Sequence, residues 1–237
     1  MASQFLVFVA GMMVFQCSLF GPVRAADPDP LVDFSSVAHS FTLRDIFTNG
    51  DVSHGPGGIR AALDTTIFPA MASQGLTFVQ FKLVPCGINL PHTHPRASEL
   101  LTLVEGGPIQ AGFVDTHGVA HIDILRPGDV TIFPRGMIHF EQNIGFKTAF
   151  FISALNSQNP GTLISAGAVF HLPAVVLASA LNQTVKAVTA LNSTLYAYGG
   201  ALQKSTISGC KPRKVETMQA RNGKQLKEHD AMYNWEA

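Results

Sequence analysis

The stretch of sequence that decides the fold is Pro91-His92-Thr93-His94-Pro95-Arg96-Ala97-Ser98-Glu99. Residues two apart on a strand project from the same face, so the imidazoles of His92 and His94 can converge on one ion. Glu99 lies beyond Pro95, where a bend can return its carboxylate to the same point. The stretch therefore predicts part of a metal site.

A fourth ligand is expected from a second stretch, Pro134-Arg135-Gly136-Met137-Ile138-His139-Phe140-Glu141-Gln142-Asn143. With His139, the set holds three neutral imidazoles and one carboxylate, which suits a redox-capable first-row metal such as manganese or iron. A structural zinc site is more often closed by thiolates, and the chain lacks a clustered set of cysteines. The set leaves coordination positions open, as chemistry at the metal requires.

The chain around these stretches reads as short strands separated by turn residues. The expected strands are 77–84, 100–104, 109–114, 119–125, 130–133, 138–142 and 148–154. Strands this short at this spacing indicate a mainly β protein, an antiparallel sandwich or barrel such as a jelly roll. The barrel core is therefore expected over about residues 77–154.

The period changes after Pro173, where apolar residues recur at helical spacing up to about residue 198. These residues are Val176, Leu177, Ala180, Leu181, Val185, Val188, Leu191 and Leu195. They predict one or two amphipathic helices, which either pack on the barrel or dock against a neighbouring subunit. The segment 203–237 then carries seven Lys or Arg against four acids, and a solvated, disordered basic tail is expected there rather than a binding element.

Residues 1–25 have the features of a signal peptide. An apolar run over 5–15 is too short to span a membrane, and a small-residue cleavage site precedes Ala26. The alternatives are an N-terminal membrane anchor or a buried strand. No other segment approaches the ~20 apolar residues of a spanning helix, so we expect a secreted protein without a membrane span.

Secretion agrees with two glycosylation sequons, which begin at Asn182 and Asn192. It also permits a disulfide between Cys86 and Cys210, the two cysteines beyond the signal peptide. Two unpaired thiols are the alternative. Lys plus Arg and Asp plus Glu are both 16, which argues against a nucleic-acid partner bound through bulk charge.

The two stretches match the two motifs of the cupin superfamily in spacing and order. The matching residues are His92, His94, Glu99 and Gly106 in the first, then Gly128, Pro134, Gly136, His139 and Asn143 in the second. Further landmarks at 26–31, 91–97, 133–136 and 157–162 resemble those of germins and germin-like proteins, and the similarity covers roughly residues 26–200.

The resemblance implies a single cupin domain over 26–202, a jelly-roll β-barrel with C-terminal α-helices. It also implies a manganese ion held by His92, His94, Glu99 and His139. The implied location is the apoplast or cell wall, and the implied assembly is a homo-hexamer, a trimer of dimers.

Three departures separate the chain from this family. The cysteine pair near the mature N-terminus is absent, and Cys86 replaces the first Gly of the first motif, a residue tolerant of positive φ. Oxalate-oxidising germins carry two asparagines before the motif histidines. Asn89 keeps the one nearer the motif, whereas Val79 occupies the other position and cannot donate a hydrogen bond to a carboxylate.

These features favour an extracellular manganese oxidoreductase with a small-molecule substrate. Superoxide dismutation is the leading reaction, with Asn89 as the catalytic residue lining the open face of the metal. Oxalate oxidation ranks second because of Val79. The alternative is a non-enzymatic secreted cupin that binds a metal or a ligand. Asp123 and Glu141 could also form a carboxylate pair, although nothing in the sequence requires them to meet.

Overall fold

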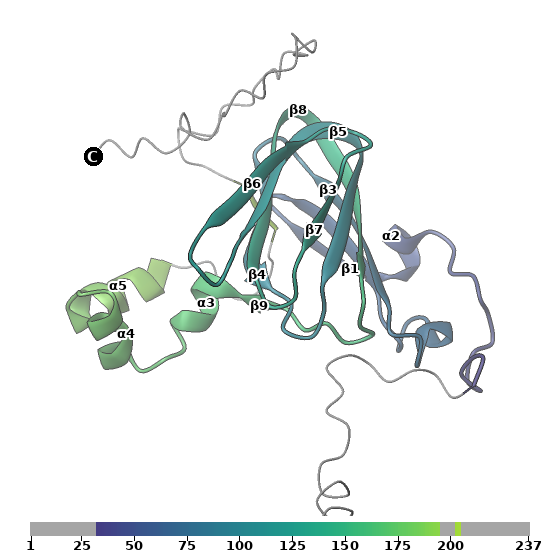
Figure 1. The fold of residues 1–237 in the computed structure, drawn as a ribbon, viewed down its shortest axis with the longest axis horizontal. Coiled ribbons are helices and arrows are strands. Elements are labelled where there is room, and N and C mark those ends of the chain that lie inside the picture. The colour runs from purple at the N-terminus through teal and green to yellow at the C-terminus, as the bar shows by residue number, and fades with distance from the viewer. Residues whose placement is uncertain (1–31, 195–201, 205–237) are drawn as a thin grey trace, which may run out of the picture.

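The computed structural model describes residues 32–194 and 202–204, and its strands form one curled antiparallel sheet (Figure 1). The strands are β1 Asp51–Gly55, β2 Gly58–Leu63, β3 Thr77–Leu83, β4 Gly87–Thr93, β5 Glu99–Val114, β6 Ala120–Leu125, β7 Val130–Phe133, β8 Ile138–Leu155, β9 Leu163–Ile164 and β10 Leu202–Lys204. The helices are α2 Ile46–Asn49, the 3₁₀ turn η1 Pro69–Met71, α3 Ser165–Val169, α4 Ala174–Ala180 and α5 Val185–Thr194.

Strand β8 is the centre of the sheet, because it pairs with β3, β4 and β5. The order of neighbours is β1-β2-β3-β8-β4-β10, while β5 also pairs with β6 and β7, and β9 pairs with β4. Each of these pairings is antiparallel. The predicted mainly β, barrel-like architecture is confirmed.

The core lies inside the curl of the sheet and follows the alternation of each strand. In β3, Val79, Phe81 and Leu83 are buried, as the alternating pattern predicts. Phe81 stacks on its cross-strand neighbour Phe151, with ring centroids 4.7 Å apart. Leu101 in β5 is also fully buried. Much of the interior of the sheet is therefore apolar.

The two long strands differ from the sequence-based expectation. Segments 100–104 and 109–114 are expected as two strands, but they are the two ends of the unbroken β5. Its register against β8 shifts three times between Leu103 and Ile109, where Gly106 and Gly107 take positive φ angles of 75° and 67°. Such bulges bend a strand without ending its pairing. Segments 138–142 and 148–154 likewise belong to the single strand β8.

The helical segment expected over about 173–198 forms α4 and α5, which are bent by 105° relative to each other. The break lies at Asn182, whose φ of 51° is left-handed and ends α4, a conformation that asparagine tolerates well. In Figure 1 the pair stands clear of the curled sheet. No single helix among the described residues is long and apolar enough to span a membrane, although this bent pair reaches that length and composition together.

Several predicted features lie at or beyond the limits of the described residues. The signal peptide 1–25 and Cys210 fall outside them. The predicted boundary between domain and tail at 202/203 falls within β10, which pairs with Gly87–Asn89 of β4, and residues 205–237 of the predicted tail are not described. Cys86 keeps a positive φ of 63° although it replaces a glycine, and it is disulfide-bonded. Its pairing with Cys210 stays a prediction.

Candidate metal centre

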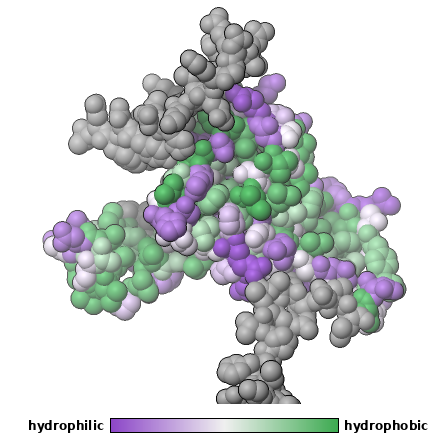
Figure 2. Space-filling view, viewed as in Figure 1, coloured by the Kyte–Doolittle hydropathy of each residue, from purple (hydrophilic) through white to green (hydrophobic). Residues whose placement is uncertain are grey.

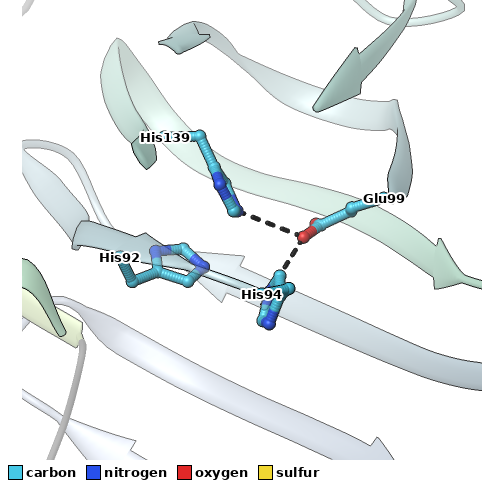
Figure 3. A group of neighbouring side chains, drawn as sticks. All are labelled: His92, His94, Glu99 and His139. Atoms are coloured by element: carbon cyan, nitrogen blue, oxygen red, sulfur yellow. Dashed lines mark ion pairs between the residues drawn. The ribbon is translucent and has the colours of Figure 1, made fainter. Parts of the chain in front are cut away.

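Four side chains from three strands converge at one end of the sheet (Figure 3). His92 lies in β4 and His94 directly follows that strand, whereas Glu99 begins β5 and His139 is the second residue of β8. One ligand atom from each lies within 4.8 Å of the others. The structure therefore brings together all four ligands predicted from the sequence.

Strand alternation and one irregularity place these side chains inside the sheet. Odd-numbered residues of β8 face inward, which buries His139, Glu141 and Asn143 in a row. Asn89 and His92 are three residues apart and would face opposite sides of a regular strand. The register of β4 against β8 shifts between them, so both are buried on the same side.

Each imidazole has its Nδ1 hydrogen-bonded to a backbone carbonyl. His92 Nδ1 lies 2.7 Å from the Leu90 oxygen and His139 Nδ1 lies 2.9 Å from the Met137 oxygen. His94 Nδ1 lies 2.5 Å from the oxygen of Gly161. Because a carbonyl only accepts, the proton of each ring is on Nδ1. In the neutral rings Nε2 then carries a free lone pair, as a metal ligand requires.

Burial and neighbouring charges keep His92 neutral and Glu99 ionised, the protonation states in which each can bind a cation. Burial lowers the pKa of His92 from 6.5 to about 3, and the charge of His139 lowers it further, so the ring is neutral at pH 7. Burial alone would raise the pKa of Glu99. Contacts with His139 and His94 outweigh burial and hold the pKa of Glu99 below its usual range, so the side chain is a carboxylate.

The four ligand atoms are better arranged to bind a divalent first-row metal than to contact one another directly. Glu99 Oε2 lies 3.1 Å from His94 Nε2 and 3.3 Å from His139 Nε2. His139 Nε2 is buried without a hydrogen-bond partner among the described residues. A cation at the centre would give this nitrogen a partner, since an unpaired buried polar atom is destabilising.

Phe133 supports the site from the apolar side. Its ring is buried in β7 and stacks on the imidazole of His139, with centroids 4.5 Å apart and planes 15° apart. The stack and the Nδ1 hydrogen bond together fix the orientation of that ring. The sequence does not predict this role of Phe133. Its only indication is that Phe133 ends a predicted strand and precedes Pro134.

Asn89, the predicted catalytic residue, is buried beside Glu141. Its Nδ2 donates to Glu141 Oε2 at 2.9 Å, and the two residues are direct neighbours across β4 and β8. Burial raises the pKa of Glu141 well above its usual value and the Glu99 charge adds to this, against the hydrogen bond from Asn89. Glu141 does not pair with Asp123, whose side chain is exposed. A second carboxyl group near the ligands is thus a feature that the sequence reasoning missed.

Val79 and the two sequon asparagines are the remaining predicted positions. Val79 is buried in β3 between its cross-strand neighbours Ala62 and Ser153. Asn182 and Asn192 are both exposed, as a glycan requires, and glycosylation stays a prediction.

The comparisons with known proteins agree with this geometry. The chain matches the Cupin family over residues 45–189. Germin-like protein 1-3 of Oryza sativa subsp. japonica is 36% identical over 168 residues, which are 69% of this chain and 74% of the rice protein. The chain is a germin-like cupin.

Two further similarities place this germin-like cupin among its relatives. Spherulin-1B of Physarum polycephalum is 41% identical over 132 residues, which are 55% of this chain and 53% of the spherulin. The solved structure of a recombinant oxalate oxidase in complex with glycolate has a TM-score of 0.62 and 27% identity, and covers 71% of this chain and 97% of the oxidase. The germin-like cupin therefore shares its fold with an oxalate-oxidising protein.

Proposed function

We propose that this germin-like protein binds manganese and works as an extracellular oxidoreductase, with superoxide as its leading substrate. One observation carries the proposal: the Nε2 atoms of three imidazoles and the Glu99 carboxylate converge, with each Nδ1 held by a carbonyl. A manganese ion bound there would supply reversible one-electron transfer. The four protein ligands leave further coordination positions open.

Superoxide is favoured because its dismutation requires little beyond a redox-active metal with an open coordination position. Two superoxide anions and two protons give dioxygen and hydrogen peroxide. The carbonyl hydrogen bonds hold the histidine rings in one tautomer, and Glu99 supplies the only carboxylate among the ligands. Asn89 is the proposed catalytic residue, since its Nδ2 has a second N–H beyond the one donated to Glu141.

Oxidation of oxalate by dioxygen, which consumes two protons and gives two molecules of carbon dioxide and one of hydrogen peroxide, is the second candidate. It is favoured by the similarity to the oxalate oxidase structure. It is disfavoured by Val79, which sits in the apolar interior where the resemblance places an asparagine. A substrate carboxylate would lose one donor there, so slow turnover of oxalate is expected.

The surface of the helix pair α4–α5 supports an oligomer. Leu177, Ala178 and Val188 pack together inside the pair, while Val175, Val176 and Leu191 are exposed. Figure 2 shows this lobe as largely hydrophobic. An apolar surface of this kind is typical of an interface, and we propose the homo-hexamer that the family resemblance implies. Secretion to the apoplast or cell wall is proposed on the signal peptide and the two sequons.

The test uses full-length protein from a secretory host, with the metal content measured first. The proposal predicts superoxide dismutation that scales with bound manganese and disappears in Glu99→Ala. Oxalate-dependent peroxide production, measured in parallel, should be weak. Manganese-loaded protein without superoxide activity would support the non-enzymatic alternative, and strong peroxide production from oxalate would reverse the ranking of substrates.

A further inference from the structure

His94 differs from the other two histidines in the source of its carbonyl partner. His92 and His139 bond to carbonyls two residues earlier, at Leu90 and Met137. These partners come with the local chain. His94 instead bonds to the carbonyl of Gly161, which is 67 residues away in sequence. The orientation of His94 therefore depends on where the segment 159–162 is held.

Arg96 holds that segment through three hydrogen bonds. Its Nε donates to the Asn159 carbonyl at 2.6 Å, and its Nη2 donates to Asn159 Oδ1 at 2.7 Å. Its backbone N–H donates to the Pro160 carbonyl at 3.1 Å. Hydrogen bonds from a guanidinium are charge-assisted and its fork is rigid, so two such bonds fix both position and direction.

Gly161 closes the contact from the other side. Its φ of 67° lies in the left-handed region, and a Cβ at this position would lie 2.7 Å from Arg96 Nη2. A side chain here would strain the backbone and push the guanidinium off Asn159. The contact between Arg96 and Asn159 thus requires a glycine at position 161, the residue whose carbonyl reaches His94.

We propose that Arg96 is a positioning residue: by clamping Asn159 and Pro160 it holds the Gly161 carbonyl against His94 Nδ1. This contact keeps the His94 proton on Nδ1 and its Nε2 free for the metal. The inference rests on the four-ligand site, and it does not depend on which metal or reaction the protein uses.

The clamp also joins the site to the helices. The next residues, Leu163 and Ile164, form β9 and pair with Thr93 and His92 of β4. Helix α3 begins directly after them, at Ser165. Residues 159–164 thus connect the Arg96 hydrogen bonds to α3, which leads on to the helix pair α4–α5. The Arg96 hydrogen bonds fix the start of this connection beside the ligands.

The first test measures Mn²⁺ affinity of the full chain by competition with a chelator. Arg96→Ala should bind Mn²⁺ about 10- to 100-fold more weakly, the usual cost of losing a group that orients a ligand. Arg96→Lys should fall in between, because one ammonium group cannot reproduce the fork. Gly161→Ala should resemble Arg96→Ala. The control is Arg60→Ala, since Arg60 forms a surface ion pair with Asp51 instead, and it should leave affinity unchanged.

The second test separates positioning from general damage, using ¹⁵N spectra of the histidine side chains in the metal-free full chain. Arg96→Ala should move the His94 proton from Nδ1 toward Nε2, while His92 and His139 keep their Nδ1–H form. The proposal is overturned if His94 stays as in the wild type, or if all three rings change together with a lowered thermal midpoint. Because this readout uses neither metal nor activity, a protein that fails as an oxidoreductase can still confirm the clamp.

Discussion

His92 and Glu141 should give the metal-free protein two opposite pH dependences of stability. Both side chains are buried within the sheet, with His92 3% and Glu141 0% exposed. Burial lowers the pKa of His92 to about 3 and raises the pKa of Glu141 well above 4.5. Above pH 4.5, and below the raised pKa of Glu141, the folded chain therefore holds a neutral imidazole and a neutral carboxyl group, whereas the unfolded chain holds a carboxylate and, up to about pH 6.5, a charged imidazole.

The signs follow from proton counts. In this window the unfolded chain binds one proton more than the folded chain at His92, so this residue makes the free energy of unfolding rise with pH. At Glu141 the folded chain binds the extra proton, so this residue makes the free energy of unfolding fall as pH rises. Each effect amounts to at most about 1.4 kcal/mol per pH unit, and the two oppose each other in the wild type.

Single substitutions should expose each slope. Relative to wild type, Glu141→Gln should steepen the rise of stability with pH by up to about 1.4 kcal/mol per unit, and His92→Gln should lower the slope by up to the same amount. Urea unfolding followed by far-UV circular dichroism at pH 4.5, 5.5 and 6.5 measures this, with chelator present. The protein concentration is held constant because assembly also affects stability. Slopes equal to that of the wild type in both variants would show that neither group has a shifted pKa in the folded chain.

Three further predictions concern the metal, the substrate and the assembly. His139→Ala should lose most of its bound metal, since each ligand contributes strongly, and an unchanged metal content by elemental analysis would argue against this ligand. Val79→Asn should raise the rate of oxalate oxidation, because a missing contact to a charged substrate costs ~1.5–3 kcal/mol; a wild-type protein that already oxidises oxalate quickly would contradict it. A chain that ends after Phe170 should form smaller, less stable particles, and light scattering that finds the intact protein monomeric at micromolar concentration would count against the interface.

The ligands could be predicted because short spacings in the sequence indicate where their side chains lie. His92 lies in β4 and His94 follows two residues later, just beyond the end of the strand, so alternation predicts a common direction for the two side chains. The same alternation applies along β8. Glu141 is two residues after His139 on this strand, so its burial beside the ligands is also predictable from the sequence.

Other features have no local signal. The bond from His94 to the Gly161 carbonyl involves a backbone oxygen, which every residue carries, at a distance of 67 residues. The unbroken course of β5 depends on bulges at Gly106 and Gly107, and in sequence these glycines look like the end of a strand. The break between α4 and α5 has no local signal either, because apolar residues recur at helical spacing on both sides of Asn182.

Metal analysis of the secreted full-length protein decides whether His92, His94, Glu99 and His139 bind manganese. Elemental analysis combined with electron paramagnetic resonance should find about one manganese ion per chain, and Glu99→Ala should lose it while keeping the fold by circular dichroism. A folded wild-type protein that carries no manganese after growth with the metal supplied, or a Glu99→Ala protein that keeps its full complement, would show that these four residues do not hold manganese.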